Sequence, residues 1–525
     1  MPRMLVSDPL ATEGLELLRT QGDVDVKLRM DPAELLTIIG EYDALVVRSE
    51  TRVTAEVIEA GSRLQVIGRA GVGVDNIDVE AATRRGIPVV NAPTGNTIAA
   101  AEHTIAMMLA LARNIPQAHE SLRRGEWTRS AFTGVEVRNR VLGVIGLGKV
   151  GTEVSNRARG LQMRVLGYDP FVSPEHASML GIELASLERI FEESDFICLH
   201  TPLTESTRGI IGENALSMMK PNVRILNVAR GELVDEDALL KAVEEGRVAG
   251  AALDVFSKEP PHGSPLLDER RIIVTPHLGA STEEAQAEVA REVAEQVIAV
   301  LQGRSAMHTV NAPFVPPETQ RVLTPFVDAG SYAGKLAAQL VTGQLQSVNL
   351  RYDGEIATHD TNLLRAACLV GILSPISDER VNLINANLHA SQRGLRITEQ
   401  KSPSAEEHGS LITVEMETTE RKIAISAAQV RGETHIVRIN DYWIDIVPTG
   451  GYMLIAHHQD RPGMIGAVGT ITGKHDINIG FMEVGRLEPR GHATMIIGLD
   501  DPLPDSVLAE INSLPNMVQT VVVQL

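Results

Sequence analysis

The chain has 525 residues, which is too long for a single hydrophobic core and predicts about three or four domains. Its net charge of −20 arises from 48 Lys and Arg against 68 Asp and Glu. This balance argues against a nucleic-acid-binding or membrane-surface protein, because both need a basic surface. The two cysteines, Cys198 and Cys368, belong to no CxxC motif, so neither a disulfide framework nor a zinc site is expected.

The amino-terminal segment lacks the basic and then apolar pattern of a signal peptide. The most apolar stretch, Thr97–Ala112, is interrupted by Glu102 and His103 and is too short to span a bilayer. We therefore expect a cytoplasmic protein with no membrane partner and no nucleic-acid partner.

Residues 1–97 alternate short apolar runs with helical patterns, which predicts a mostly parallel sheet. The expected strands are residues 3–8, 44–49, 65–70 and 87–93. The expected helices between them are residues 12–20, 54–61 and 79–86. A long Ala-, Met- and Leu-rich helix follows, from about Asn96 to Gln117.

The same alternation restarts at Arg140 with six further strand patterns. They cover residues 140–146, 164–169, 196–200, 224–229, 250–255 and 272–276. Six strands in βα alternation are typical of a doubly wound dinucleotide-binding fold. A helix over 282–301 closes this region, and we expect it to pack back on the first domain, which would make that domain discontinuous in sequence.

The composition changes at residues 311–320, which read as a linker. Residues 320–450 contain two helical segments and then alternating strand-like stretches, which predicts an α+β domain. A second joint lies at 448–452. The last segment, 452–525, has the order β-α-β-β-α-β, which predicts a small ferredoxin-like module.

A glycine-rich loop joins the first strand of the second alternating region to a helix. Its G-x-G-x-x-G pattern is formed by Gly146, Gly148 and Gly151. These glycines allow a tight turn, close approach of a pyrophosphate and close helix packing, while Lys149 and Val150 open the helix whose free N–H groups face the anion. Asp169 ends the next strand, where an acid accepts from ribose hydroxyls and repels a 2′-phosphate. The pattern therefore predicts NAD rather than NADP.

Three titratable residues follow strands or loops of this same region: Arg230, Glu259 and His277. Ligands of an open α/β sheet bind outside the carboxyl ends of its strands, so all three are expected to share the cofactor crevice. His277 can remove a hydroxyl proton, Glu259 can fix its tautomer, and Arg230 can bind a carboxylate. Taken singly, each could instead be an ordinary salt-bridge partner, solvated acid or capped strand end.

The first domain offers candidate substrate contacts at its strand ends. Arg48 and Arg69 would suit a second anion, and a phosphate is the natural one. Either arginine could instead merely balance charge. The remaining expected substrate-binding residues are Ser49, Asn96, Thr97 and Arg129, the last across a subunit interface.

Six motifs, in order along residues 1–305, resemble the D-isomer-specific 2-hydroxyacid dehydrogenases. They are "GRAGVGVDNID", "GLGKVG", "LHTPLTEST", "NVARGELVDEDAL", "ALDVF" with "EPP", and "TPHLGAST". The resemblance implies that His277 is the acid/base, Glu259 its partner and Arg230 the substrate anchor. It also implies that Asp254 contacts the nicotinamide carboxamide. The other cofactor contacts that it implies are Thr201, Pro202, Ala229 and Gly279.

The stretch "HHQDRPGMIGAVGTITGKHDINI" resembles the start of an ACT domain, an amino-acid-sensing module. We expect His458, Asp460 and Asn478 to bind an effector there. A hydroxyacid dehydrogenase joined to an intervening segment and an ACT domain resembles the long members of this family, which act on 3-phospho-D-glycerate. That resemblance implies L-serine as effector. Dimerisation through the long helix and pairing of the ACT-like modules would give a homo-oligomer, either a dimer or a tetramer.

The expected domains are a substrate-binding domain (1–97 with 288–310), an NAD-binding Rossmann domain (98–287), an intervening domain (311–450) and an ACT regulatory domain (451–525). No metal site is expected. Two alternatives stay open. One is another hydroxyacid oxidoreductase, such as a glyoxylate or hydroxypyruvate reductase. The other is a nucleotide-sensing scaffold with little turnover.

Overall fold

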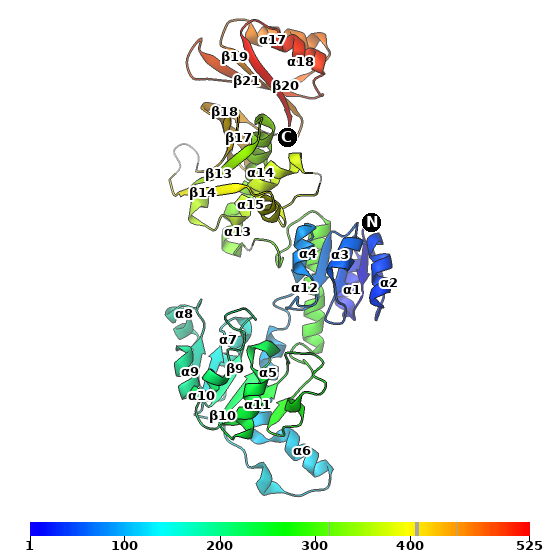
Figure 1. The fold of residues 1–525 in the computed structure, drawn as a ribbon, viewed down its shortest axis with the longest axis vertical. Helices are drawn as coiled ribbons and strands as arrows, with labels where there is room; N and C mark the ends of the chain where they lie inside the picture. The colour runs from blue at the N-terminus through cyan, green and yellow to red at the C-terminus, as the bar shows by residue number, and fades with distance from the viewer. Residues whose placement is uncertain (314, 378, 405–408, 449) are drawn as a thin grey trace. The chain divides into compact units, whose positions relative to one another are not determined.

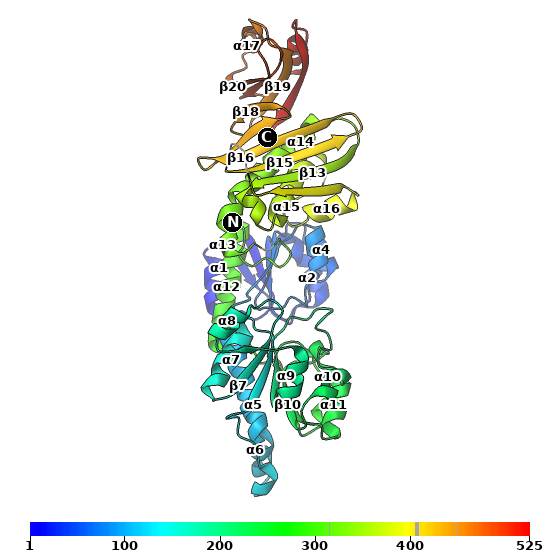
Figure 2. The same ribbon diagram turned by 90° about the vertical axis from the view of Figure 1, so that its left-hand side faces the viewer.

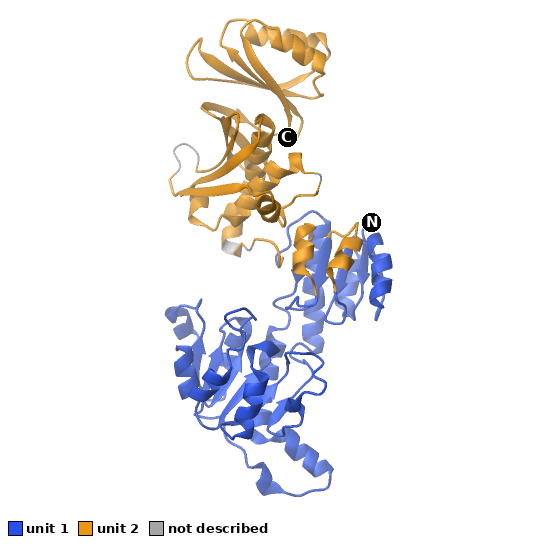
Figure 3. Cartoon of the chain, in the orientation of Figure 1, with its two compact units in different colours: residues 1–52, 66–76, 90–308 blue, residues 53–65, 77–89, 309–525 orange. Residues whose placement is uncertain are grey.

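The structure is a computed structural model that describes residues 1–313, 315–377, 379–404, 409–448 and 450–525. The chain forms two compact units, which Figure 3 colours separately. The first unit comprises residues 1–52, 66–76 and 90–308, and the second comprises residues 53–65, 77–89 and 309–525. Among the described residues, no helix is long and apolar enough to cross a bilayer.

The first sheet has five strands in the order β2-β1-β3-β4-β5. Their bounds are β1 Arg3–Val6, β2 Asp23–Val26, β3 Ala44–Val47, β4 Val66–Arg69 and β5 Val89–Asn91. Strand β1 pairs in parallel with β2 and β3, and β3 pairs in parallel with β4. The sequence patterns missed β2, because this edge strand is half solvated and its "DVDV" contains no continuous apolar run.

Helix α12, Glu283–Leu301, packs on this first sheet although it follows the second sheet in sequence. Val289, Val293 and Val297 are buried in one core with residues of β1, β3 and β4. A Cβ at Gly68 of β4 would lie 2.7 Å from a Val297 methyl carbon, so the absence of a side chain permits this close packing.

The predicted long helix is wrong in one respect, because it is two helices. Helix α5 spans Thr97–Arg113, and α6 spans Ile115–Arg123. Asn114 between them has a φ of 51°, in the left-handed region. Pro116 explains the break, since a proline inside a continuous helix removes a hydrogen bond and its ring clashes with the preceding turn.

The second sheet has seven parallel strands in the order β12-β11-β10-β9-β6-β7-β8. Two neighbouring strands of this sheet, β9 and β10, are labelled in Figure 1. They are β6 Val141–Ile145, β7 Arg164–Tyr168, β8 Glu183–Leu184, β9 Phe196–Leu199, β10 Val223–Asn227, β11 Val248–Leu253 and β12 Ile272–Val274. The six predicted strands are confirmed, and the two-residue β8 is an addition. The strand order reverses between β6 and β9, the position at which such sheets bind ligands.

Helices cover both faces of this sheet (Figure 2). One core contains residues of α5 and of α7, Lys149–Gly160. The other contains residues of α9 Leu187–Glu193, α10 Glu213–Met218 and α11 Glu236–Glu244. The apolar strand runs are therefore buried from both sides, as a parallel sheet requires.

The second unit contains an α+β domain whose mixed sheet has the order β14-β13-β15-β16-β17-β18. Its strands are β13 Leu345–Gly354, β14 Arg396–Ser402, β15 Ser410–Thr418, β16 Lys422–Val430, β17 Glu433–Ile439 and β18 Tyr442–Ile446. Its principal helices are α13 Pro317–Leu323, α14 Pro325–Leu340, α15 Asn362–Leu373 and α16 Ala386–Gln392. The prediction placed all strands after the helices. It missed β13, because polar residues alternate with apolar residues along this strand and it contains no continuous apolar run.

The last module forms a four-stranded antiparallel sheet of order β20-β21-β19-β22. Its elements are β19 Tyr452–Gln459, α17 Met464–Lys474, β20 Ile479–Arg486, β21 His492–Leu499, α18 Asp505–Asn512 and β22 Met517–Gln524. The predicted β-α-β-β-α-β order is confirmed. Leu454 and Ala456 of β19 pack toward α17 and α18, whereas Met453 and Ile455 join the core around α14.

Candidate active site

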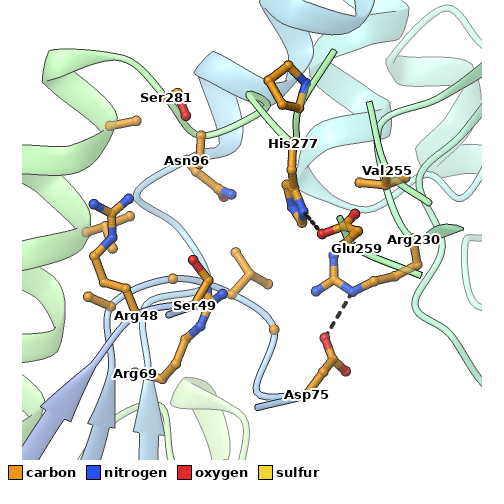
Figure 4. Close-up of a pocket in the computed structure, with 18 of the residues that line it drawn as sticks. Arg48, Ser49, Arg69, Asp75, Asn96, Arg230, Val255, Glu259, His277 and Ser281 are labelled. Carbon is orange, nitrogen blue, oxygen red and sulfur yellow. Dashed lines mark hydrogen bonds and ion pairs between the residues drawn. The ribbon is translucent and has the colours of Figure 1, made fainter. Parts of the chain in front are cut away.

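A cavity of about 500 Å³ lies in the first unit, where carboxyl ends of strands from both sheets face each other (Figure 4). It brings together most of the predicted catalytic and substrate-binding residues. These residues are Arg48, Ser49, Arg69, Asn96, Arg230, Glu259 and His277. The βα alternation explains this convergence, because parallel strands deliver their carboxyl ends to one edge of each sheet.

His277 and Glu259 form a direct pair within the cavity. The Nδ1 atom of His277 lies 2.8 Å from Glu259 Oε2. Burial raises the pKa of Glu259, but the hydrogen bond and charge of His277 and the Phe256 N–H outweigh it, so the pKa is lower than the ordinary value. An ionised Glu259 accepts the Nδ1 proton of His277, which leaves Nε2 as the ring nitrogen able to take a proton from a ligand.

Arg230 follows β10 and points into the same cavity (Figure 4). Its Nη1 donates to the carbonyl of Ala229 at 2.7 Å, and its Nε lies 3.4 Å from Asp75 Oδ2. A Cβ at Gly73 would lie 2.2 Å from Arg230 Nη2, so the glycine leaves room for the guanidinium. The Arg230 guanidinium is therefore held through Nη1 by a backbone carbonyl, and its other partner, Asp75, is an exposed carboxylate that a ligand anion could replace.

The opposite wall of the cavity is strongly basic. Arg69 is mostly buried, and its Nε has no hydrogen-bond partner among the described residues. Burial, and then the charge of Arg230, lower the pKa of Arg69 to about 10. Arg48 and Arg52 line the same wall. Clustered arginines with an unpaired buried N–H group need an anion, which makes this wall suitable for a phosphate or carboxylate.

The backbone of this wall is fixed by two polar side chains. Asn76 donates from Nδ2 to the carbonyls of Arg48 and Thr51, both at 2.7 Å. Asp8 accepts from the backbone N–H of Arg48 at 2.5 Å and from the Thr51 hydroxyl. Arg48 and Ser49 are thus presented by a braced turn after β3.

The glycine loop after β6 has the shape that a dinucleotide needs. Gly146 has a φ of 97°, and a Cβ there would lie 2.6 Å from the His200 carbonyl oxygen. A Cβ at Gly151 would lie 1.9 Å from the Gly146 carbonyl oxygen. At Gly148 a Cβ would meet nothing within 4 Å, so the loop surface is open there, immediately before Lys149 and Val150 begin α7.

The other expected dinucleotide contacts surround this loop. Asp169 directly follows β7, and its carboxylate accepts from the backbone N–H of Leu147 and of Phe171, both at 2.9 Å. The Thr201 hydroxyl is buried and has no partner among the described residues, next to Pro202 at the end of β9. An orphaned hydroxyl, an open glycine and a fixed acid fit an NAD phosphate and ribose.

Asp254 has only 1% of its side chain exposed, and its carboxylate accepts hydrogen bonds from the loop that contains His277. Its carboxylate accepts from the backbone N–H of Leu278 at 2.7 Å and of Gly279 at 2.8 Å. The Thr275 hydroxyl donates to it at 2.6 Å. The predicted contact of Asp254 with the nicotinamide carboxamide stays a prediction, as does the approach of Ala229 and Gly279.

A second cavity of about 380 Å³ opens in the last module. His458 and Asp460 line it, together with the start of α17. Asp460 accepts through Oδ2 from the Arg490 backbone N–H at 3.1 Å and from Arg486 Nη1 at 3.2 Å. Asn478 does not line this cavity and donates instead to Asp500 at 2.6 Å.

Two predicted substrate residues lie outside the lining of the active-site cavity. Thr97 is the first residue of α5, and Arg129 begins a short 3₁₀ helix, Arg129–Phe132. Among the described residues, no group of three or more His, Cys, Asp or Glu side chains could hold a metal ion.

The sequence reasoning missed four residues of this site: Arg52, Asp75, Asn76 and His103. Arg52 and Asp75 line the cavity, and Asn76 braces it. Arg52 and Asp75 belong to strand-exit segments, a signal that could have identified them. His103 lies in α5, the helix that follows Asn96, and its Nε2 is 3.3 Å from Asp254 Oδ1; no local sequence pattern marks it.

Three family models match the chain. The NAD binding domain of D-isomer specific 2-hydroxyacid dehydrogenases matches residues 105–279. The intervening domain of D-3-phosphoglycerate dehydrogenase matches residues 322–440, and the ACT domain matches residues 452–516.

Curated relatives match over nearly their whole length. A D-3-phosphoglycerate dehydrogenase of Synechocystis sp. is 45% identical, covering 100% of this chain and 95% of the relative. One of Methanocaldococcus jannaschii is 44% identical and is covered completely, as is this chain.

Among solved structures, a protein of Thermus thermophilus is 36% identical with a TM-score of 0.55, covering 59% of this chain and 99% of that protein. A D-lactate dehydrogenase of Aquifex aeolicus, complexed with NAD and lactic acid, is 28% identical with a TM-score of 0.52. That match covers 57% of this chain and 96% of the lactate dehydrogenase.

Proposed function

The chain belongs to the D-3-phosphoglycerate dehydrogenase family, and we propose that His277, Glu259 and Arg230 perform its reaction. That reaction is the NAD-dependent oxidation of 3-phospho-D-glycerate at C2. It yields 3-phosphooxypyruvate, NADH and a proton, and it opens the phosphorylated route to L-serine.

The proton is handled by the pair of His277 and Glu259. His277 Nε2 accepts the C2 hydroxyl proton, because Nδ1 is already engaged with Glu259. The imidazolium that forms is stabilised by the carboxylate 2.8 Å away. The chemistry that NAD supplies when bound is the acceptance of hydride from C2.

The two anionic ends of the substrate meet opposite walls of the cavity. Arg230 binds the carboxylate with its planar fork, in place of the exposed Asp75. Arg48, Ser49 and Arg69 bind the phosphate, and the buried, unpartnered Nε of Arg69 supports that assignment. Thr97 and Asn96 would serve the same end of the substrate. A cavity with basic groups at both ends favours a phosphorylated acid over lactate or glyoxylate.

NAD would be held by the loop of Gly146, Gly148 and Gly151 together with the start of α7, at Lys149 and Val150. Asp169 would accept from the adenosine ribose hydroxyls and select against a 2′-phosphate. The further contacts that we propose are Thr201, Pro202, Ala229, Asp254 and Gly279.

The pairing of His277 with Glu259 in a cavity lined by arginines is the observation on which this assignment depends. The test is NADH formation by the purified protein with 3-phospho-D-glycerate and, in parallel, with D-glycerate, for wild type and for His277→Ala. We expect turnover of the phosphorylated acid that falls by about 10²- to 10⁴-fold in the variant, the contribution of general acid–base catalysis. Equal turnover of both acids would contradict the phosphate wall. Turnover of neither acid would favour a nucleotide-sensing scaffold.

We also propose that L-serine binds the ACT cavity of His458 and Asp460 and that the protein is a homo-oligomer, a dimer or a tetramer. Asp460 uses Oδ2 for both of its hydrogen bonds, which leaves Oδ1 to accept an amino group. Asn478 and Arg129 are assigned to contacts that a second copy of the chain would complete. The two buried free cysteines support a reducing, cytoplasmic location.

A further inference from the structure

The backbone at His277 is in an unfavourable conformation. Its φ is 55°, in the left-handed region that is unfavourable for a residue with a side chain. Such a conformation persists only when its neighbours fix it. The ring of His277 can meet a substrate in one defined orientation only if the segment Thr275–Gly279 is held in place.

Asp254 accepts most of the hydrogen bonds that fix the segment Thr275–Gly279. Its main-chain carbonyl accepts from the His277 N–H at 2.9 Å. Its carboxylate accepts from Leu278 through Oδ1 and from Gly279 through Oδ2. Three successive backbone N–H groups therefore point at one residue, so the geometry of His277 depends on the position of Asp254.

His103 completes the donors around this buried carboxylate. Its Nε2 lies 3.3 Å from Asp254 Oδ1 and 3.2 Å from Thr275 Oγ1. The one hydroxyl proton of Thr275 is directed at the carboxylate, at 2.6 Å, so its oxygen presents only lone pairs to His103. Both neighbours of Nε2 are then acceptors, and Nε2 must be the nitrogen that carries a proton.

His103 comes from helix α5, which lies directly against the same segment. A Cβ built at Gly279 would lie 4.0 Å from the Cβ of Ala100, one turn before His103. Met107, one turn after His103, has its sulfur 3.6 Å from the Thr275 hydroxyl. The contact of His103 is thus part of a packed surface between α5 and the segment, and its side chain is only 20% exposed.

We propose that His103 is a positioning residue of the dehydrogenase reaction. Its Nε2–H, through Asp254 and Thr275, fixes the segment Thr275–Gly279 and so the orientation of the His277 ring. This inference rests on the proposed function of His277, and it adds a residue that touches neither substrate nor cofactor.

Two substitutions separate a hydrogen-bonding role from simple packing. The side-chain amide of His103→Gln can place an N–H group where the imidazole Nε2 lies, whereas the shorter His103→Asn reaches only the Nδ1 position. We expect His103→Asn to lower kcat by about 10- to 100-fold, since a hydrogen bond to a buried charge is lost. KM for 3-phospho-D-glycerate stays close to wild type, and His103→Gln recovers most of kcat. The exposed His119→Asn is the matched control and keeps wild-type values.

A second measurement does not depend on turnover. Hydrogen exchange at the Leu278 and Gly279 amides is expected to accelerate in His103→Asn and to stay near wild type in His103→Gln, at unchanged global unfolding midpoints. Equal kcat in all variants, equal losses in the Asn and Gln variants, or unchanged exchange in His103→Asn would each overturn the proposal. If wild type forms no NADH with 3-phospho-D-glycerate, the proposed function fails, while the exchange data still decide whether His103 holds the segment.

Discussion

The residues of the catalytic cavity differ in how firmly their partners hold them. His277 has Glu259 as a close partner at 2.8 Å, whereas Arg230 meets Asp75 at 3.4 Å through a carboxylate that is 79% exposed. A solvent-exposed ion pair contributes little free energy, so a substrate carboxylate can displace Asp75 at small cost. The proposed base, His277, is therefore pre-organised, and Arg230 is available to exchange Asp75 for the carboxylate of the proposed substrate.

Replacing Glu259 by Gln tests that pre-organisation. The amide cannot stabilise the imidazolium, because it has no negative charge, so we expect kcat to fall by about 10- to 100-fold. KM for the substrate should change less, because Glu259 acts on His277. Steady-state kinetics at saturating NAD measure both constants. Glu232→Gln removes an acid from the same cavity that does not pair with His277 and is the control. Equal losses in both variants would contradict the assigned role.

The ionisation of the buried Asp254 carboxyl group links the stability of the fold to pH. Burial raises its pKa, but hydrogen bonds from His103, Thr275 and Leu278 outweigh burial, so its pKa lies below the ordinary value. A carboxyl group with a depressed folded-state pKa stabilises the fold above its unfolded pKa of about 3.9, and this stabilisation is lost as the pH falls through the folded pKa.

Asp254→Asn should therefore lower the free energy of unfolding at pH 7 by about 1–3 kcal/mol, because an amide NH₂ faces donors there. It should also make the loss of stability below about pH 4 shallower, since one titrating group is gone. Urea unfolding at several pH values measures both effects. An unchanged acid slope would show that Asp254 is not a linked group.

At the scale of secondary-structure elements, the glycine loop gives two nearby positions with opposite surroundings. A Cβ at Gly151 would overlap the Gly146 carbonyl oxygen at 1.9 Å, whereas at Gly148 it would project into open space. Gly151→Ala should lower the unfolding midpoint and NAD affinity together. Gly148→Ala should keep the midpoint and weaken NAD alone, because its methyl group occupies the space of the pyrophosphate. Thermal unfolding and NAD titration separate the two, and a normal NAD affinity in Gly148→Ala would refute the assigned pyrophosphate position.

The elements that were predictable from sequence are those with continuous apolar runs or a helical period. Strands β6, β7 and β9 are buried from both sides, and each appears in the sequence as a short run of mainly apolar residues. The two-residue β8 and the edge strand β2 were not predictable this way, because half-solvated strands have mixed composition. The break at Asn114 could have been predicted from Pro116, since proline disfavours a continuous helix.

For the candidate site, the sequence predicted which residues come together in the cavity, but it did not predict all of their partners. His277 and Arg230 follow strands, and parallel topology brings such positions together without any knowledge of side-chain contacts. The partners Asp75 and His103 come from segments far away in sequence. Their pairing depends on how a turn and a helix pack, which no periodicity encodes.

At the scale of the whole molecule, the catalytic cavity belongs to the first unit and the ACT cavity to the second. Within the second unit the ACT sheet shares a core with α14 through Met453 and Ile455, and Gln339 of α14 bonds to both backbone groups of Gln524. The ACT module is therefore packed against the α+β domain of the same unit. A ligand that stabilises it also stabilises the packing of α14.

That coupling yields the prediction for L-serine. A ligand at about 100 times its Kd stabilises the folded state by about 2.7 kcal/mol if it binds no unfolded chain. Serine should thus raise the unfolding midpoint of the second unit and slow hydrogen exchange in both α17 and α14, because the ACT sheet lies between these helices.

Asp460→Ala should abolish both effects by removing the acceptor for the amino group. Asp501→Ala, an exposed acid outside the cavity, should retain them. Protection confined to α17 would mean that serine binds without coupling to α14. No protection in wild type would show that serine does not bind this ACT cavity, because a bound amino acid must slow exchange at the helix whose first turn it contacts.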